Sequence, residues 1–376
     1  MQKDSILDRV LESHNEERLA EADPAFVLQD LLSHLDKREA EILRRRHGLH
    51  GGEGETLEEV GKRYGITRER VRQIEQSALQ KVKKQIQNSA MVAVLRQVVR
   101  NLFASHGGIL THDHFFDRLQ EGGSSLIEST KAAWHFLLNH LLTGEVVALE
   151  ERPAWRGGWY VPEVCWDAVD SVMKEVKAVF GEAKQPLTWD EFHELFKARQ
   201  VAQKHAQVLA RHPYPLNEEA LKAYVRASDE IGENAVGRFG LREWPEVTPK
   251  RVGDKIYVIL RHYNKPLHYR EIARLIVEHK FDHKKASPET VHNELILDKR
   301  FVLVGRGVYA LREWGYEPGV VAEVVARVLR EHGPLPKEKV VTEVLKQRLV
   351  KPETVALTLS NRKRFNRLPD GNYAVV

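Results

Sequence analysis

Four polar side chains between residues 68 and 73 have the types and the spacing that reading DNA base edges requires. They are Arg68, Glu69, Arg72 and Gln73. Positions i, i+1, i+4 and i+5 share one face of an α-helix. Arginine can donate two hydrogen bonds to guanine, glutamine can pair with adenine, and glutamate can accept from the amino group of cytosine. We therefore predict that this face enters the major groove of DNA. A solvated, charged helix surface is the alternative.

A helix-turn-helix between residues 57 and 74 is predicted to position this face. Apolar residues recur there at a spacing that lets two short helices pack across a tight turn. Gly61 would keep the first helix thin where the second crosses it, and Gly65 would supply the positive φ that the turn needs. The second helix is expected to begin near Thr67. The apolar positions are Val60, Tyr64, Ile66, Val71 and Ile74.

Charge is unevenly distributed along this chain of 376 residues, although its net charge is only +4. Residues 1–34 carry three basic and eight acidic side chains, whereas residues 62–84 carry eight basic and two acidic ones. The segment 319–376 is also basic, with eleven cations against six anions. This pattern indicates that the basic helix, rather than the acidic leader, faces phosphates. The length predicts roughly two to five domains.

Composition also argues against several classes of protein. The single cysteine, Cys165, excludes an intramolecular disulfide and a cysteine-based zinc site. We find no apolar run of transmembrane length and no signal core, so we expect a cytoplasmic, nucleoid-associated protein with no membrane partner.

Neither a metal, nor a cofactor, nor an enzyme activity is expected. His112 and His114 are better interpreted as the start of a helix capped by Thr111 than as metal ligands. Gly305-Arg306-Gly307 lies between strand-like residues and predicts a hairpin tip rather than a phosphate-binding loop. We recognise no nucleophile with an adjacent base, so the catalytic residues are predicted to be none.

Residues 35–84 resemble region 4 of the bacterial primary sigma factors, the domain that reads the −35 promoter element. Residues 35–49 are similar to the first helix pair of that family, and residues 67–75, TRERVRQIE, are close to its signature. The resemblance implies that Arg68, Glu69, Arg72 and Gln73 face the bases of a TTGACA-like hexamer. It also implies that phosphates are contacted by Lys62, Thr67, Arg70 and Lys81.

Region 4 of that family also docks on the flap of the RNA polymerase β subunit. The resemblance makes Leu35, Ile42 and Leu43 candidates for the matching apolar surface, and burial in an ordinary core fits them equally well. About 34 residues precede the similar segment. We therefore expect no domain that melts the −10 element, and a protein that is not a complete sigma factor.

After about residue 90, one pattern recurs four times. Each copy has a turn leading into a helix, and closes with a glycine, an aromatic residue and a strand, so each glycine is expected at a hairpin turn. The closing marks are Gly158-Trp159-Tyr160, Gly237-Arg238-Phe239, Gly307-Val308-Tyr309 and Gly371-Asn372-Tyr373. Lys299-Arg300-Phe301 also recurs 64 residues later as Lys363-Arg364-Phe365. A repeat of this length fits a small domain.

Three helices followed by a hairpin form the winged-helix plan. We predict a mostly α fold with small β-hairpin wings, in which a sigma region 4-like helix-turn-helix precedes about four tandem winged-helix domains. The third copy resembles the HARE-HTH domain, a family that includes the N-terminal domain of the RNA polymerase delta subunit. The predicted segments are an acidic helical leader at 1–34, the helix-turn-helix at 35–90, and winged helices at 91–163, 166–246 (with an insertion), 248–318 and 319–376.

These features predict a DNA-binding transcription regulator. Its expected partners are double-stranded DNA, the RNA polymerase core through the β flap, and other protein subunits. Two groups of cations lie near the wings, where they fit phosphate contacts or a merely solvated hairpin: Lys299 with Arg300, and Arg362, Lys363 and Arg364 with Arg367. Two alternatives are a scaffold that binds the flap without reading bases, and a DNA-targeting subunit of a defence or restriction-modification system whose catalysis lies in a partner chain.

Overall fold

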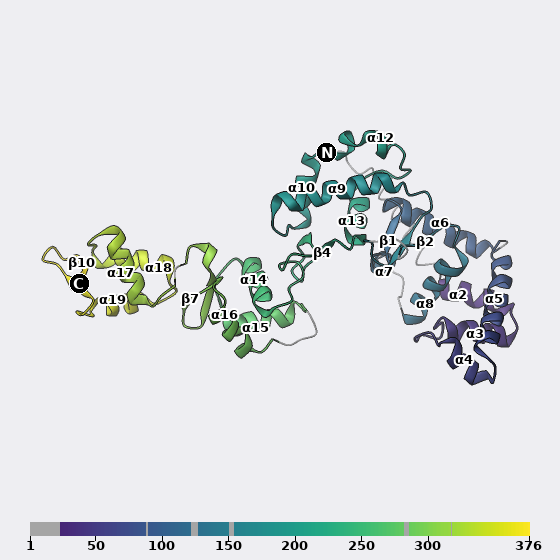
Figure 1. The fold of residues 1–376 in the computed structure, drawn as a ribbon, viewed down its shortest axis with the longest axis horizontal. Coiled ribbons are helices and arrows are strands. Elements are labelled where there is room, and N and C mark those ends of the chain that lie inside the picture. Colours follow the sequence, from purple (N-terminus) through teal and green to yellow (C-terminus); the bar gives the residue numbers. More distant parts are fainter. Residues whose placement is uncertain (1–22, 88, 122–126, 150–153, 282–285, 317) are drawn as a thin grey trace. The chain divides into compact units, whose positions relative to one another are not determined.

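The computed structural model describes residues 23–87, 89–121, 127–149, 154–281, 286–316 and 318–376, so most of the predicted leader lies outside the described residues. The described chain is mostly helical with small antiparallel hairpins, as predicted (Figure 1). It divides into two compact units: residues 1–181 with 193–231, and residues 182–192 with 232–376. This division falls inside the segment 166–246 that the sequence predicted as one domain.

The predicted helix-turn-helix is present, and both of its helices begin at a threonine cap. The helices of this region are α2 (Pro24–Ser33), α3 (Lys37–Arg46), α4 (Leu57–Tyr64) and α5 (Arg68–Gln85). Thr56 and Glu59 cap α4 reciprocally through a complete capping box. Gly65 ends α4 with a φ of 63°, and the Thr67 hydroxyl accepts from the Arg70 backbone N–H. α5 is 18 residues long, so the second helix is longer than predicted.

Gly61 allows the chain to turn closely from α4 into α5. A Cβ atom on Gly61 would lie 2.7 Å from the carbonyl oxygen of Ile66, which is closer than real contacts allow. Val60 and Val71 are fully buried on either side of the turn and cluster with Ile42. The prediction that Gly61 keeps the first helix thin is therefore confirmed, and the packing of the two valines determines how α5 is presented.

The first repeated segment has a helix, a strand, two helices and two more strands. These are α6 (Ala90–Ser105), β1 (Ile109–Thr111), α7 (His112–Glu121), α8 (Glu128–Phe136) with the π-helical turn η1 (Leu137–Leu141), β2 (Val147–Ala148) and β3 (Gly158–Tyr160). Thr111 caps α7 as predicted, accepting from the His114 N–H at 3.2 Å. Gly158 does not form the predicted turn. It lies in β3, where a Cβ atom would be 2.3 Å from the Leu110 carbonyl oxygen, so glycine permits close approach of two strands.

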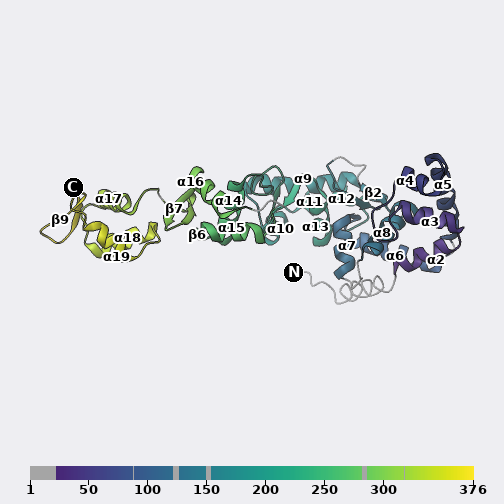
Figure 2. The same cartoon turned by 90° about the horizontal axis from the view of Figure 1, so that it is seen from below.

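Helix α8 lies beside α2 (Figures 1 and 2). The turn η1 contacts α5. The α2 residues Val27, Leu28, Leu31 and Leu32 are buried. At the end of α3, the ring of His47 lies 4.8 Å from that of Phe136 and 4.6 Å from that of His140, measured between centroids. The third helix of this repeat is therefore used to hold the helix-turn-helix.

The last helix of the second repeated segment, α13 (Glu218–Ala227), is buried as well. The elements are α9 (Trp166–Ala183), α10 (Trp189–Ala198), α11 (Val201–Lys204), α12 (Ala206–Leu209), α13 (Glu218–Ala227), β4 (Ile231–Glu233) and β5 (Phe239–Leu241). Helix α13 packs on β1. The Tyr224 hydroxyl donates to the Gly107 carbonyl oxygen at 2.9 Å, and a Cβ atom on Gly107 would lie only 2.4 Å from that hydroxyl. Glycine therefore lets α13 approach the first repeat this closely.

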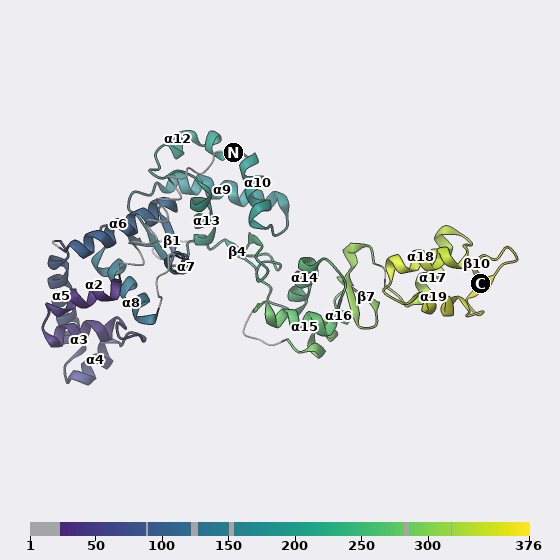
Figure 3. The same cartoon turned by 180° about the vertical axis from the view of Figure 1, so that it is seen from behind.

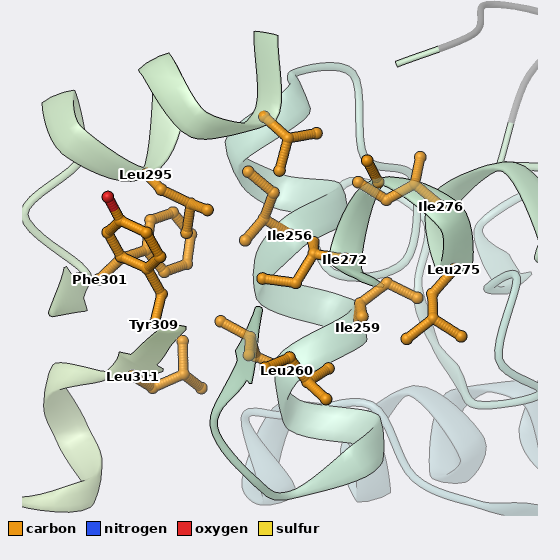
Figure 4. Close-up of a cluster of buried hydrophobic side chains, with 13 residues drawn as sticks. Ile256, Ile259, Leu260, Ile272, Leu275, Ile276, Leu295, Phe301, Tyr309 and Leu311 are labelled. Atoms are coloured by element: carbon orange, nitrogen blue, oxygen red, sulfur yellow. The ribbon is translucent and has the colours of Figure 1, made fainter. Parts of the chain in front are cut away.

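The third repeated segment builds its core from three helices and a sheet of order β6-β8-β7. Its elements are α14 (Val252–Tyr263), β6 (Leu267–His268), α15 (Tyr269–Glu278), α16 (Pro288–Leu297), β7 (Phe301–Gly305), β8 (Val308–Leu311) and the 3₁₀ turn η3 (Arg312–Trp314). Figure 4 shows side chains such as Ile256, Ile272 and Phe301 gathered between them. Gly307 has a φ of 69° between β7 and β8, so the predicted hairpin tip is confirmed.

The last repeated segment has the same order of helices followed by a hairpin (Figure 3). Its elements are α17 (Val321–His332), α18 (Lys337–Gln347), α19 (Pro352–Leu359), β9 (Phe365–Arg367) and β10 (Tyr373–Val375). The buried Arg348 guanidinium donates to the carbonyl oxygens of Leu303 and Gly319. The Leu349 N–H donates to the Val304 carbonyl oxygen at 2.8 Å. These bonds join the last repeat to the hairpin of the third.

We predict that Gly61→Ala loosens the helix-turn-helix, because the new Cβ atom must push the Ile66 carbonyl away. The opening free energy of α4 and α5 should fall by about 1–3 kcal/mol, the usual range for overpacking. Hydrogen exchange of the backbone amides of these helices measures it. Gly52→Ala is the control, because no atom lies within 4 Å of the position of its Cβ. Equal exchange in both variants would contradict the proposed constraint.

Candidate nucleic-acid interface

The predicted base-reading face of α5 is exposed to solvent, and it lies opposite the buried Val71. Its members are Arg68, Glu69, Arg72 and Gln73. Arg72 binds Glu69 through two hydrogen bonds, from Nε to Oε2 at 2.9 Å and from Nη2 to Oε1 at 2.5 Å. The bonds from Arg72 lower the pKa of the Glu69 carboxyl. This carboxylate is therefore ionised at neutral pH and can accept a hydrogen bond from a base.

Gln73 is also engaged before any ligand binds. Its Oε1 accepts from Nη1 of Arg70 at 3.1 Å. Glu69 and Arg72 thus pair with each other, and Gln73 pairs with Arg70, each pair spanning three residues of the helix. Exposed pairs of this kind contribute about 0–1 kcal/mol, whereas a good bidentate contact with a base contributes about 1–3 kcal/mol. The pairs can therefore open in exchange for base contacts.

A hollow opens at the N-terminus of α5, next to three of the predicted phosphate ligands. It is lined by Glu58, Gly61, Lys62, Gly65, Ile66, Thr67, Arg68 and Arg70. Unpaired N–H groups at a helix N-terminus attract phosphate. Lys62 is exposed and paired with Glu58 at 2.8 Å. The Thr67 oxygen already accepts from the backbone of Arg70, which leaves its hydroxyl hydrogen as the donor for a phosphate.

Lys81, the fourth predicted phosphate ligand of this module, joins two helices. Its Nζ donates to both carboxylate oxygens of Glu39 on α3, at 2.7 and 2.9 Å. The Glu39 side chain is mostly buried, with 13% of its surface exposed. Lys81 therefore holds α5 on α3 in the free protein, and its phosphate contact stays a prediction.

The predicted polymerase-contact residues are in the core. Leu35 is 8% exposed, and Ile42 and Leu43 are fully buried. Ile42 packs with Val60 and Val71 under the helix-turn-helix. A side chain without exposed surface offers nothing to a partner, so the core interpretation is correct for Ile42 and Leu43. Their burial depends on helices distant in sequence, which a local pattern does not reveal.

The two predicted basic clusters near the hairpins differ in their surroundings. Nη2 of Arg300 lies 3.0 Å from Asp254 and 2.6 Å from Asp298, and its guanidinium lies 5.4 Å from the centroid of the Tyr257 ring. Arg300 is thus neutralised within its own domain, whereas Lys299 is exposed. The sequence analysis missed this pairing, although Asp298 stands only two residues away.

The corresponding turn of the last repeat is basic throughout. Lys363 and Arg364 are exposed after α19, and so are Arg362 before them and Arg367 on β9. At the offset of 64 residues, Arg362 stands where the third repeat has Asp298. The carboxylate that neutralises the third repeat is therefore replaced by another cation.

Other features of the described chain add no cofactor chemistry. In the described ranges, no three His, Cys, Asp or Glu side chains gather in a way that would hold a metal ion. His114 is buried, with its ring centroid 5.1 Å from that of His106, and burial lowers its pKa to about 3. Among the helices that the structure describes, none combines the length and the apolar character needed to cross a bilayer.

The N-terminal helices match a known family. Residues 31–84 match the model of sigma-70, region 4, four residues earlier than the predicted start. The chain is 53% identical over 57 residues to the RNA polymerase principal sigma factor HrdD of Streptomyces viridifaciens, covering 15% of this chain and 17% of the relative. It is 55% identical over 56 residues to the RNA polymerase sigma factor SigA of Bacillus sp, covering 15% of each. The chain thus spans less than a fifth of the length of these relatives. The helix-turn-helix at residues 31–84 is a sigma-70 region 4 domain.

Proposed function

We propose that this protein is a DNA-binding transcription regulator whose helix α5 reads a −35-like element. The observation that carries the proposal is the exposed polar face of α5 on a folded sigma-70 region 4 domain. Its side chains have the donors and acceptors that distinguish bases in the major groove. The hollow and free N–H groups at the start of the same helix supply a place for the DNA backbone.

The packing of the first unit supports an assignment of base reading to α5. In a helix-turn-helix or winged domain, the helix that enters the groove must be accessible. α8 is instead packed against α2, and α13 against β1. The first two repeats therefore act as a scaffold for the helix-turn-helix, and their helices α8 and α13 do not read DNA.

A second, sequence-independent DNA contact is proposed in the last repeat, at Arg362, Lys363, Arg364 and Arg367. Four exposed cations within six residues form a local positive surface. Such groups bind phosphates without selecting bases. The third repeat does not share this role, because Asp254 and Asp298 already neutralise Arg300. Arg300 is therefore left out of the proposed phosphate contacts, which rest on Arg362, Lys363, Arg364 and Arg367.

RNA polymerase is proposed as a protein partner, on the ground that both relatives are sigma factors of RNA polymerase by name. The docking surface must differ from the buried Ile42 and Leu43. Phe26 on α2 is 61% exposed and Val94 on α6 is 48% exposed, and these two helices pack together. An exposed apolar surface at this place is a better candidate for a protein contact. A modification or defence complex is the alternative partner.

The first test changes the base-reading face. Arg68→Ala with Gln73→Ala should remove discrimination between a TTGACA duplex and a scrambled duplex, because each substitution removes a bidentate base contact that contributes about 1–3 kcal/mol. Fluorescence anisotropy of both duplexes measures it. Lys84→Ala is the control. It removes an exposed cation in the last turn of α5 and should weaken binding to both duplexes by the same factor. Undiminished discrimination in the double variant would contradict base reading by α5.

A second test examines the last repeat by its salt dependence. Changing Arg362, Lys363 and Arg364 to Gln should reduce the slope of log K against log salt by about 0.9 for each phosphate that is no longer neutralised. The control is Lys280→Gln with Arg306→Gln, two exposed cations of the third repeat that are not among the predicted phosphate ligands, and it should leave the slope unchanged. If the control variant lowers the slope and the triple variant does not, the third repeat contacts phosphates and the last repeat does not.

Polymerase binding is tested by co-elution of the full chain with core RNA polymerase on a sizing column. We expect co-elution, and its weakening by Phe26→Ser. Leu297→Ser, which changes a 77% exposed leucine on α16, is the control and should have no effect. If the chain binds the duplex and does not co-elute, the polymerase proposal fails and the protein is a DNA reader alone. A methyltransferase or nuclease retained in native purification would support the alternative.

A further inference from the structure

A cavity of about 300 Å³ lies between the hairpin turn at residues 234–238 and helix α14. Its walls come from the second unit: the chain before α10 and the start of that helix, the hairpin turn, Glu246 after β5, and α14 with the residue that follows it. The polar side chains that line it include Lys184, Arg238, Arg261, His262 and Asn264. The volume is at the lower end of the range for small-molecule sites.

The walls of this cavity are joined to one another. Nη2 of Arg261 donates to Oε1 of Gln185 at 2.9 Å, which connects α14 to the segment before α10. His279, at the end of α15, lies with Nδ1 3.2 Å from the carbonyl oxygen of Ala235 in the hairpin turn. The cavity is therefore a built feature of the fold and not a gap between loose segments.

Two guanidinium groups at the cavity are held in place by the protein. Nη1 of Arg238 donates to the Pro186 carbonyl oxygen and to Glu191, at 3.2 Å in both cases. Nη1 of Arg261 donates to Glu313 at 3.1 Å. An arginine has five N–H donors, so each group keeps donors for a ligand. Orientation before binding lowers the entropic cost of binding a ligand.

Among the described residues, one of the three cations that line the cavity, Lys184, has no carboxylate partner. Arg238 pairs with Glu191, and Arg261 pairs with Glu313, which lies outside the lining. The Glu191 carboxylate is already occupied by the Thr188 backbone N–H at 2.8 Å and by Arg238. Within the described part of the chain, no hydrogen bond or ion pair engages the Lys184 ammonium group. A cation without a partner and two oriented guanidinium groups match the chemistry of a phosphate.

The backbone and the histidine of the site agree with this assignment. Lys184 and Asn264 both adopt left-handed φ angles, 52° and 47°. For lysine this conformation costs about 1–2 kcal/mol, which glycine would avoid. Burial lowers the pKa of His262, and the nearby His279 and Arg238 lower it further. A bound anion would offset these like charges.

We propose that this cavity binds a small phosphate-bearing molecule, and that the protein has an effector site in addition to its DNA contacts. The phosphate would lie among Lys184, Arg238 and His262, and the remainder of the ligand against Tyr257, Val258 and Pro186. Because the site joins the hairpin of the second repeat to α14 of the third, its occupant stiffens the junction between them.

The test uses the full chain with ribose 5-phosphate, with ribose as the uncharged probe. Histidine-selective NMR should show a saturable shift of the His262 ring signal with ribose 5-phosphate and none with ribose. The pKa of His262 should rise on binding, because an anion stabilises the protonated ring. Lys184→Gln should weaken binding about tenfold, the effect expected when one charge-assisted hydrogen bond is removed.

Lys280→Gln is the matched control, because Lys280 is also an exposed lysine with a left-handed φ, 50°, and does not line the cavity. It should bind as tightly as the unchanged chain. Equal weakening in both variants, a shift of His262 with ribose, or the absence of a shift with ribose 5-phosphate would each overturn the proposal. If Lys184→Gln instead lowers the slope of log K against log salt for duplex DNA, the cavity is part of the DNA-binding surface. The effector site would then be disproved, and the proposed role of α5 would still stand.

Discussion

The burial of α8 against α2 is the contact on which the first unit depends. Domains of this size bury a smaller fraction of their surface than larger ones do and are marginally stable, and the packing of α8 on α2 adds to the surface that the first repeat buries. Val27, Leu28, Leu31 and Leu32 form the buried face of α2, and α8 packs on that helix. The same solution joins α13 to β1, where Gly107 lets Tyr224 approach. Helices α8 and α13 are held by this packing, whereas the polar face of α5 stays exposed.

Comparison of the third and fourth repeats shows that neighbours decide what an arginine does. Arg300 and Arg364 occupy equivalent positions in copies of one sequence pattern. Arg300 is enclosed by Asp254, Asp298 and the ring of Tyr257. In the last repeat Asp298 is replaced by Arg362, so the same turn changes from a neutral structural element to a cationic one. The replacement of Asp298 by Arg362 thus removes one of the two carboxylates that pair with the arginine in the third repeat.

What the sequence predicted well was local. The caps at Thr67 and Thr111 and the turn at Gly65 depend on residues within about four positions, where spacing determines contact. What it predicted wrongly depends on distant residues. Gly158 meets Leu110 across a sheet and forms no turn. For Ile42 and Leu43 the sequence left a polymerase contact and an ordinary core open, and the packing of separate helices buries both side chains. The four positions predicted to read bases share one exposed face because a helix places them together, whereas the cavity near Lys184 is lined by segments that no spacing relates.

The cavity lies, in sequence, between α5 and the basic turn of the last repeat. If both ends bind one duplex, the second contact forms at an effective concentration set by the chain that connects them. Freedom at the junction near Arg261 and Ala235 lowers that concentration, because many arrangements place the second contact away from the DNA. A ligand that fixes the junction reduces the number of arrangements it adopts. DNA binding becomes stronger if the remaining arrangements include the one that places both contacts on the duplex, and weaker if they do not. Neither DNA-contacting surface needs to change for this coupling to operate.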